Sequence, residues 1–248
     1  MSELEIVHEG AVATIIFSRP ERLNALSLGS MERLDSALAK LEVDAGIRVL
    51  ILTGAGGRAF GAGLDIKEAV TLMPDQHARQ HRLYESIQRR LAAFPKPLVA
   101  AIEGIAAGAS LQLALHCDLI VVSETARIGM PELSAGRPCI MGSYLLASRI
   151  GPVFASRLVL GQDWIGAEDA LAVGLASSRS PAGHAHASAK VYAEKLAATA
   201  PQALAETLRW LRELRNEGTH GLTSAFARAD DILPAAAGSK EALEASRS

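Results

Sequence analysis

Two stretches rich in glycine and alanine carry the residue types best suited to binding an anion through the main chain. The first is RAFGAGLDIKE at 58–68, which follows the apolar run VLIL at 49–52. Gly61 and Gly63 permit backbone dihedral angles that other residues avoid, and they allow a ligand to approach the main chain closely. If residues 64–66 begin a helix, their N–H groups lack intrahelical acceptors and point outward. This stretch is therefore a predicted binding site for an anionic or developing negative oxygen.

A second stretch repeats the arrangement. The apolar residues 98–102 predict a buried strand, and the sequence GIAAGAS at 104–110 leads into a helical pattern at 111–116. Two such strand-to-helix turns in one chain would place two N–H donors on a single oxygen. A carbonyl that becomes an enolate during a reaction requires this pair of donors.

The elements that must position these turns alternate between strands and helices. Strands are expected at 6–8, 12–17, 48–53, 98–102, 118–123 and 126–129. A helix is expected at 30–43, where Met31, Leu34, Leu38 and Leu41 share one face, and another at 74–93, before Pro95 and Pro97. This alternation predicts an α/β fold with parallel strands.

The pattern becomes helical from residue 142 onward. Helices are expected at 142–150, 153–160, 167–173, 184–200, 202–216 and 221–236. We therefore divide the chain into an α/β core, residues 1–180, and a C-terminal helical region, residues 181–248.

The composition argues against several classes of protein. A chain of 248 residues that is 49% hydrophobic can bury a sizeable core. The formal net charge of −2 gives no global attraction to nucleic acid or to an anionic membrane. No apolar run reaches membrane-spanning length, and the residues MSELEIVHEG lack the features of a signal peptide. Cys117 and Cys139 form no disulfide framework, so the expected compartment is the cytoplasm.

Two other kinds of binding site find little support. GAGGRA at 54–59 matches the dinucleotide pattern GxGxxA, but Gly61 and Gly63 interrupt the helix that should follow it. His77 and His81 share a helical face, yet the residues between them lack the glutamate of a zinc protease. The sequence therefore predicts neither a nicotinamide site nor a metal site.

Four motifs, in their order and spacing, resemble those of the enoyl-CoA hydratase/isomerase family, the crotonases. They are RPERLNALS at 19–27, ILTGAGGRAFGAGLDIKE at 51–68, AIEGIAAGASLQLALHCDL at 101–119 and RIGMPEL at 127–133. Residues 151–176 also resemble the family's helical region, so the resemblance covers roughly residues 5–180. It implies a crotonase-like spiral of β-β-α turns and acyl-CoA thioester substrates, as in fatty acid metabolism. It also implies no cofactor beyond the substrate's coenzyme A, and a homotrimer or hexamer built through the C-terminal helices.

The resemblance also implies roles for single residues. Leu64 and Ala109 correspond to the two backbone N–H donors of the family's oxyanion hole, although the family often has glycine at the second position. The segments that run along coenzyme A in the family correspond to Leu23, Ala25, Asp65, Ile66 and Lys67.

The acid/base positions decide which reaction is expected. Glu132 corresponds to the family's second catalytic glutamate, and in an apolar pocket its pKa would rise. At the first catalytic glutamate this chain has Gln112, whose amide can orient a water or bind Glu132 but cannot act as a base. Because hydration in the family uses two carboxylates, the single glutamate favours isomerisation of a 3-enoyl-CoA to a 2-enoyl-CoA.

Several alternatives stay open. The protein could be a hydratase in which Gln112 holds the water, or a catalytically silent family member that binds acyl-CoA or RNA. Arg137, where many relatives have a glycine-rich turn, either pairs with a carboxylate or reaches the acyl group. Arg209, Arg212 and Arg215 are expected on a solvated helix face, with a CoA phosphate or a neighbouring subunit as alternative partners.

Overall fold

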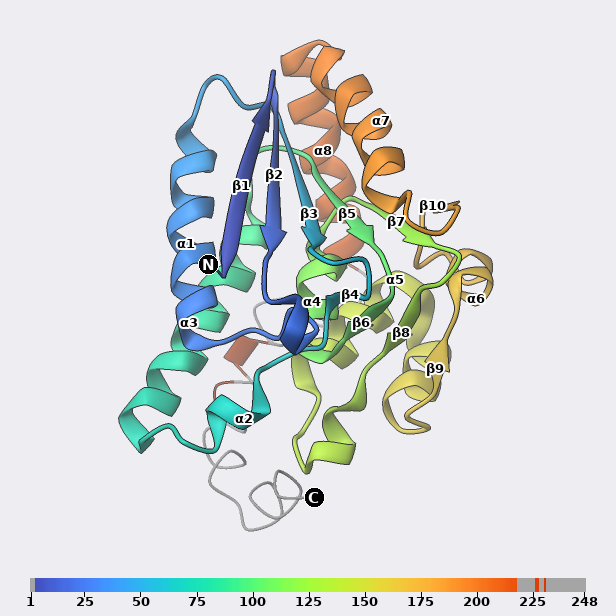
Figure 1. The fold of residues 1–248 in the computed structure, drawn as a ribbon. Coiled ribbons are helices and arrows are strands. Elements are labelled where there is room, and N and C mark those ends of the chain that lie inside the picture. Colours follow the sequence, from blue (N-terminus) through green and yellow to red (C-terminus); the bar gives the residue numbers. More distant parts are fainter. Residues whose placement is uncertain (1–2, 218–225, 228–229, 231–248) are drawn as a thin grey trace.

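Two sheets form the framework of the computed structural model, which describes residues 3–217, 226–227 and 230 (Figure 1). The large sheet has the order β1-β2-β3-β5-β7-β10, and its strands are parallel except for the antiparallel β1–β2 pair. These strands are β1 (Leu4–Glu9), β2 (Val12–Phe17), β3 (Val49–Gly54), β5 (Leu98–Ile102), β7 (Leu119–Ser123) and β10 (Ser178–Ser180).

The small sheet has the order β4-β6-β8-β9, with β8 and β9 antiparallel. Its strands are β4 (Ala59–Gly61), β6 (Ile105–Ala107), β8 (Arg127–Gly129) and β9 (Trp164–Ile165). Figure 1 shows β4, β6 and β8 continuing below β3, β5 and β7. Three successive units therefore run from a large-sheet strand to a small-sheet strand and then to a helix, which confirms the crotonase-like spiral of β-β-α turns.

The longer helices are α1 (Leu28–Val43), α3 (Pro74–Ala92), α4 (Gly108–His116), α5 (Ile140–Val159), α7 (Ala185–Ala198) and α8 (Pro201–Glu217). Shorter ones are α2 (Ile66–Ala69), α6 (Ala167–Ala172) and the 3₁₀ turns Pro20–Arg22 and Pro131–Ala135. No helix in the described part of the chain is long and apolar enough to span a membrane.

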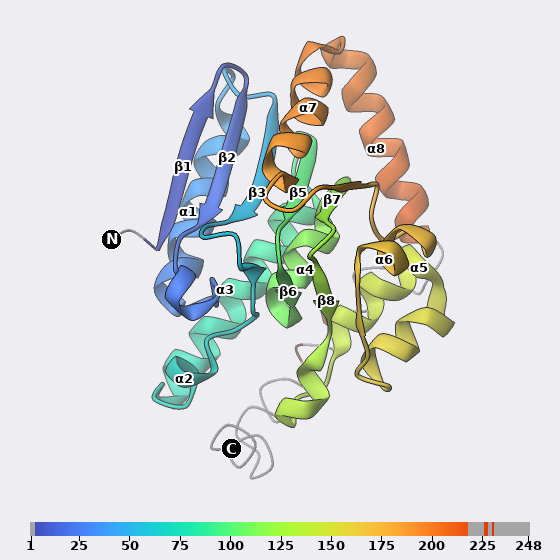
Figure 2. The same ribbon diagram turned by 45° about the vertical axis from the view of Figure 1, so that its right-hand side comes forward.

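The parallel strands β3, β5 and β7 at the centre of the large sheet are buried on both faces, as parallel strands usually are, whereas the edge strand β1 is largely exposed. On one face, side chains of β2, β3, β5 and β7 join those of α1, α3 and α4 in the main core. On the other face, α7 packs on β3, β5 and β7 (Figure 2). Its alanines Ala185, Ala189 and Ala193 are buried there, and their small side chains allow the helix to lie close to the strands.

The helices expected from residue 142 onward have three different outcomes. The two helices expected at 142–150 and 153–160 are confirmed, because the segment labelled α5 consists of two helices that meet at a kink at Gly151, where φ is 77° and ψ is 158°. Two short strands, β9 and β10, lie in the part expected to be helical. The helix expected at 221–236 falls outside the described residues except for 226–227 and 230.

The arginine face of α8 is not solvated throughout, which corrects the expectation. Arg212 donates to both carboxylate oxygens of Asp118, at 2.8 and 2.6 Å, and its side chain is only 11% exposed. Arg215 is also largely buried beside Asp118, whereas Arg209 is exposed. Asp118 in turn accepts a hydrogen bond from the N–H of Leu98 at 2.8 Å, so the pair ties α8 to the start of β5.

Candidate active site

The first predicted turn is held against the loop after the Pro20–Arg22 turn. The N–H of Ala62 donates to the carbonyl of Leu23 at 3.0 Å, and the N–H of Leu26 donates to the carbonyl of Gly63 at 2.8 Å. The N–H of Asp65 then returns to the carbonyl of Leu26 at 2.9 Å. Within the described residues, this pattern leaves the N–H of Leu64 without an acceptor.

The helix after this turn begins later than we expected. Asp65 is the N-cap of α2 and accepts a hydrogen bond from the N–H of Glu68 at 3.1 Å, so Leu64 lies outside the helix. The N–H of Leu64 is free among the described residues because Leu26 pairs with Gly63 and Asp65, the residues on either side of Leu64. A helix start at Leu64 is not the reason. The carboxylate of Asp65 also pairs with Arg19 at 2.8 Å, which fixes the turn to the preceding loop.

The second turn places its donor beside the first. Helix α4 begins at Gly108, so the N–H of Ala109 lies in the first turn, where no intrahelical acceptor is available. A methyl group added at Gly63 would lie 3.5 Å from the nitrogen of Ala109. The predicted donors Leu64 and Ala109 therefore belong to adjacent turns.

Ser110 links the two turns. Its hydroxyl is fully buried and accepts a hydrogen bond from the N–H of Gly63 at 3.1 Å, across 47 residues of sequence. A side chain at Gly61 would collide with the Ser110 hydroxyl, so this contact also requires glycine in β4. The sequence analysis did not identify this role, although the position of the serine one residue after the second donor is a usable signal.

Glu132 lies on the other side of the second turn, in the Pro131–Ala135 3₁₀ segment. Gln112 donates from Nε2 to Oε1 of Glu132 at 2.9 Å. A methyl group added at Gly108 would lie 3.6 Å from the same carboxylate oxygen. Oε2 of Glu132 is buried and has no hydrogen-bond partner among the described residues.

Tyr84, which the sequence analysis missed, orients Gln112 from α3. Its hydroxyl lies 2.7 Å from the carbonyl of Ala109 and 3.3 Å from Oε1 of Gln112. With Oε1 turned toward Tyr84, Nε2 of Gln112 is directed to Glu132. Tyr84, Gln112 and Glu132 thus form a hydrogen-bonded series, which fixes the atom of the Gln112 amide that faces the Glu132 carboxylate.

Burial raises the pKa of Glu132 above its ordinary value of 4.5, and the hydrogen bond from Gln112 and the charge of Arg137 oppose this only in part. The pKa of Cys139 is raised to about 12 by burial and by the Glu132 charge. Burial also raises the pKa of Tyr84 well above 10. Tyr84 and Cys139 therefore stay protonated at neutral pH, and Glu132 is the group at this turn that can exchange a proton.

Tyr84 and Glu132 line a cavity of about 590 Å³. Of the predicted site residues, Leu64, Ile66, Ala109, Gln112 and Glu132 line it. Leu23, Ala25, Asp65 and Lys67 do not. Leu23 and Asp65 instead hold the turn through the contacts described above, and the carbonyl of Ala25 accepts a hydrogen bond from Arg19 at 2.8 Å.

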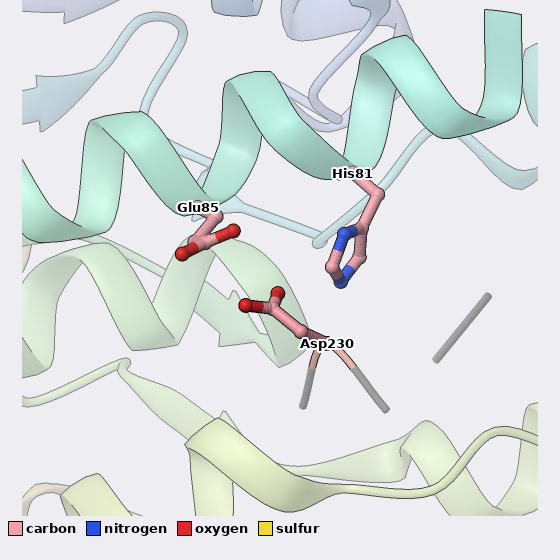
Figure 3. A group of neighbouring side chains, drawn as sticks. All are labelled: His81, Glu85 and Asp230. Atoms are coloured by element: carbon pink, nitrogen blue, oxygen red, sulfur yellow. The ribbon is translucent and has the colours of Figure 1, made fainter. Parts of the chain in front are cut away.

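A cluster of His81, Glu85 and Asp230 lies at the α3 side of the same cavity, and Figure 3 shows Asp230 facing the two α3 side chains. Their potential ligand atoms lie within 4.8 Å of one another. Glu85 is already paired with Arg89, and Asp230 is exposed. Since Glu85 already has a cationic partner and Asp230 is exposed, we assign no metal to the cluster.

Comparison with known proteins agrees with this geometry. Residues 7–230 match the family model described as enoyl-CoA hydratase/isomerase. The chain is 38% identical over 217 residues to a putative enoyl-CoA hydratase of Thermus thermophilus, covering 86% of this chain and 85% of the relative. It is 35% identical to the 2,3-dehydroadipyl-CoA hydratase of Escherichia coli, with 86% and 83% covered. A solved enoyl-CoA hydratase/isomerase of Xanthobacter autotrophicus Py2 superimposes with a TM-score of 0.88 at 31% identity, covering 99% of this chain and 93% of that one.

Proposed function

Because this chain belongs to the enoyl-CoA hydratase/isomerase family, whose enzymes act on acyl-CoA, we propose that it isomerises a 3-enoyl-CoA to a 2-enoyl-CoA. One observation carries the choice of reaction: the group that faces Glu132 is the amide of Gln112 and not a second carboxylate. An amide cannot accept a proton at neutral pH, so in this pair Glu132 is the member that can act as a base. A double-bond shift requires one such base.

The proposed reaction begins with the thioester oxygen between the N–H groups of Leu64 and Ala109. Glu132 removes a proton from C2, and the C–H electron pair forms a C1–C2 double bond while the thioester oxygen becomes negative. The two N–H groups stabilise this dienolate. The carbonyl at C1 then re-forms, the electron pair of the C1–C2 double bond moves to C2–C3, and the pair of the former C3–C4 double bond takes the proton that Glu132 gives to C4. No other reactant is consumed.

The raised pKa of Glu132 suits this role. A base that takes and returns the same proton works best when its pKa lies near the working pH. Burial moves Glu132 in that direction, and its unpartnered Oε2 is the oxygen available for the proton. The hydrogen bond from Gln112 holds the other oxygen in place.

Hydration of a 2-enoyl-CoA is the second candidate, because the relatives reported above are named as hydratases. In that reaction Gln112 would position the water, Glu132 would accept its proton, and the hydroxide would add to C3. The proton would then go to C2. With a single carboxylate this addition should be slower than in a two-glutamate enzyme.

Absorbance of the conjugated thioester separates the two reactions. The purified protein is incubated with a 3-enoyl-CoA and, separately, with crotonyl-CoA. Isomerisation increases the chromophore in the first reaction, and hydration removes it in the second. Glu132→Gln should lower either rate by about two orders of magnitude or more. Hydration without isomerisation would reverse the order of the two candidates, and acyl-CoA binding without turnover in the wild type would identify a catalytically silent binder.

We also propose assembly into a homotrimer or hexamer. The C-terminal helices α7 and α8 expose large apolar side chains, namely Val191, Trp210, Leu211 and Leu214. Leu214 follows Trp210 and Leu211 by four and three residues on α8, and exposed apolar side chains that share a helix face are typical of surfaces covered by a partner. Sedimentation velocity of the full chain tests this proposal, and a monomer at micromolar concentration would contradict it.

A further inference from the structure

Arg137 lines the same cavity as Glu132, and its side chain has no hydrogen-bond or ion-pair partner among the residues that the structure describes. It follows the Pro131–Ala135 turn, and its own N–H donates to the carbonyl of Glu132 at 2.9 Å. Its side chain lines the cavity and is partly buried. Nε of Arg137 is buried without a hydrogen-bond partner, and no carboxylate of the described residues forms an ion pair with it.

Other arginines of comparable burial in the described part of the chain are satisfied. Arg212 binds Asp118, Arg19 binds Asp65 and Glu3, and Arg149 donates to main-chain carbonyls including that of Leu115 at 2.8 Å. A guanidinium removed from water without such partners costs free energy. The exception at Arg137 therefore indicates that its partner is brought by the ligand.

The position of Arg137 limits what that partner can be. The charges of Arg137 and Glu132 interact, so the guanidinium lies at the proton-transfer end of the cavity. The neighbouring lining residues Pro138, Ile140 and Met141 are apolar and offer no acceptor side chain beyond the thioether of Met141. A group that reaches Arg137 therefore belongs to the acyl part of the thioester.

We propose that Arg137 is a specificity-determining residue that binds a carboxylate on the acyl chain, so that the preferred substrates are acyl-CoA thioesters with a second, free carboxyl group. The planar guanidinium can make two parallel hydrogen bonds to a carboxylate. This assignment rests on the proposed function, since it assumes an acyl-CoA in the cavity. The alternative is that Arg137 acts only on the charge of Glu132.

Binding of unreactive thioesters tests the assignment independently of the reaction. Two saturated acyl-CoA molecules of equal chain length are compared by titration calorimetry, one ending in a carboxylate and the other in its methyl ester. The wild type should bind the carboxylate about 10- to 100-fold more tightly. Arg137→Gln should abolish this preference, and Arg137→Lys should retain only part of it because an ammonium lacks the planar fork.

Arg157→Gln is the matched control, because Arg157 is an exposed arginine paired with Asp163 at 2.7 Å and does not line the cavity. It should keep the full preference. Equal binding of both thioesters by the wild type would overturn the role of Arg137 while leaving the proposed function intact. A preference that survives in Arg137→Gln would also overturn it. Failure of both thioesters to bind would overturn the proposed function and this assignment together.

Turnover adds a readout for the alternative role. With a neutral 3-enoyl-CoA, Arg137→Gln should leave KM close to that of the wild type, while loss of the Arg137 charge should move the pH profile of kcat to higher pH because that charge lowers the pKa of Glu132. With the corresponding substrate that ends in a carboxylate, KM should rise about 10- to 100-fold. An equal loss of kcat on both substrates, with KM unchanged on both, would show that Arg137 acts only through Glu132 and would overturn the assignment.

Discussion

Gln112 holds one oxygen of Glu132 through a 2.9 Å hydrogen bond, while the other oxygen of that carboxylate is buried and has no partner in the described part of the chain. The two oxygens therefore have different roles. Oε1 fixes the orientation of the group, and Oε2 is the oxygen on which a proton can be placed without breaking a hydrogen bond.

Replacing Gln112 with glutamate should change the reaction preference. Gln112→Glu places a second carboxyl group against Glu132, and like charges at this separation raise the pKa of one of the pair. We expect faster hydration of crotonyl-CoA and a pH profile that moves to higher pH. Both rates are followed by the thioester chromophore. Gln112→Ala, which removes the amide without adding a carboxyl group, should not gain hydration, and an equal gain in the two variants would contradict this explanation.

The raised pKa of Glu132 predicts that the carboxylate lowers stability at neutral pH. Between its ordinary pKa of 4.5 and the raised value, the folded protein binds more protons than the unfolded chain, so stability falls as pH rises through this range. Glu132→Gln should therefore raise Tm at pH 7, by about 2–4 °C for each kcal/mol gained, and the gain should vanish below the ordinary pKa. Differential scanning calorimetry across pH measures it. An unchanged or lower Tm at pH 7 would contradict the prediction.

Alanine at Gly63 should damage the site beyond its effect on folding. Gly63 has φ of 99°, where a side chain is strained by about 1–3 kcal/mol, and the added methyl would lie beside the N–H of Ala109. We expect Gly63→Ala to lower Tm and to reduce kcat by about 100-fold or more. Gly174→Ala is the control, because Gly174 has φ of 76° with open space around it. It should lower Tm and leave kcat unchanged.

Removal of the Ser110 hydroxyl should loosen the two turns. In Ser110→Ala the buried N–H of Gly63 loses its acceptor, which costs about 1–3 kcal/mol of the free energy of unfolding. Because alignment of the donors matters most in the transition state, kcat should fall while KM stays nearly constant. Urea unfolding and steady-state kinetics measure the two effects. Ser156→Ala, which removes an exposed hydroxyl bonded to the carbonyl of Pro152, should change neither.

The arginines of α8 provide a stability test remote from the cavity. Arg212→Ala leaves Asp118 without its main partner, and loss of one member of a buried pair costs about 3–5 kcal/mol. Arg209→Ala removes an exposed ion pair with Glu206 and should cost less than about 1 kcal/mol. Urea unfolding of both variants measures the difference. Equal midpoints would mean that the Asp118 contact contributes nothing to stability.

The parts of the site that sequence predicts are those encoded over a few neighbouring residues. Glycines flanking a short turn after an apolar run indicated a free N–H at residues 64–66, and the family resemblance selected Leu64 and Ala109 as donors; both residues line the one cavity. The reason given for Leu64 was wrong, because its free N–H depends on Leu26, which lies 38 residues earlier in the chain. A local pattern carries no information about such a partner.

The residues that sequence missed act across long separations. In the sequence, Tyr84 is one more residue of a predicted polar helix. Its role depends on the carbonyl of Ala109, 25 residues away. Arg212 reads as a surface residue until Asp118, 94 residues earlier, is placed beside it. The strands β4 and β6 are only three residues long, too short to show an alternating pattern.

The bond between Ser110 and Gly63 has a thermodynamic consequence for the proposed chemistry. The N–H groups of Leu64 and Ala109 are oriented when the chain folds, before any thioester binds. Little reorganisation is then required as charge moves onto the oxygen, and the substrate's own affinity is not consumed in aligning the donors. The free-energy cost of aligning the two donors is thus met by folding and not by substrate binding. The interactions that stabilise this part of the fold therefore also lower the activation barrier of the proposed reaction.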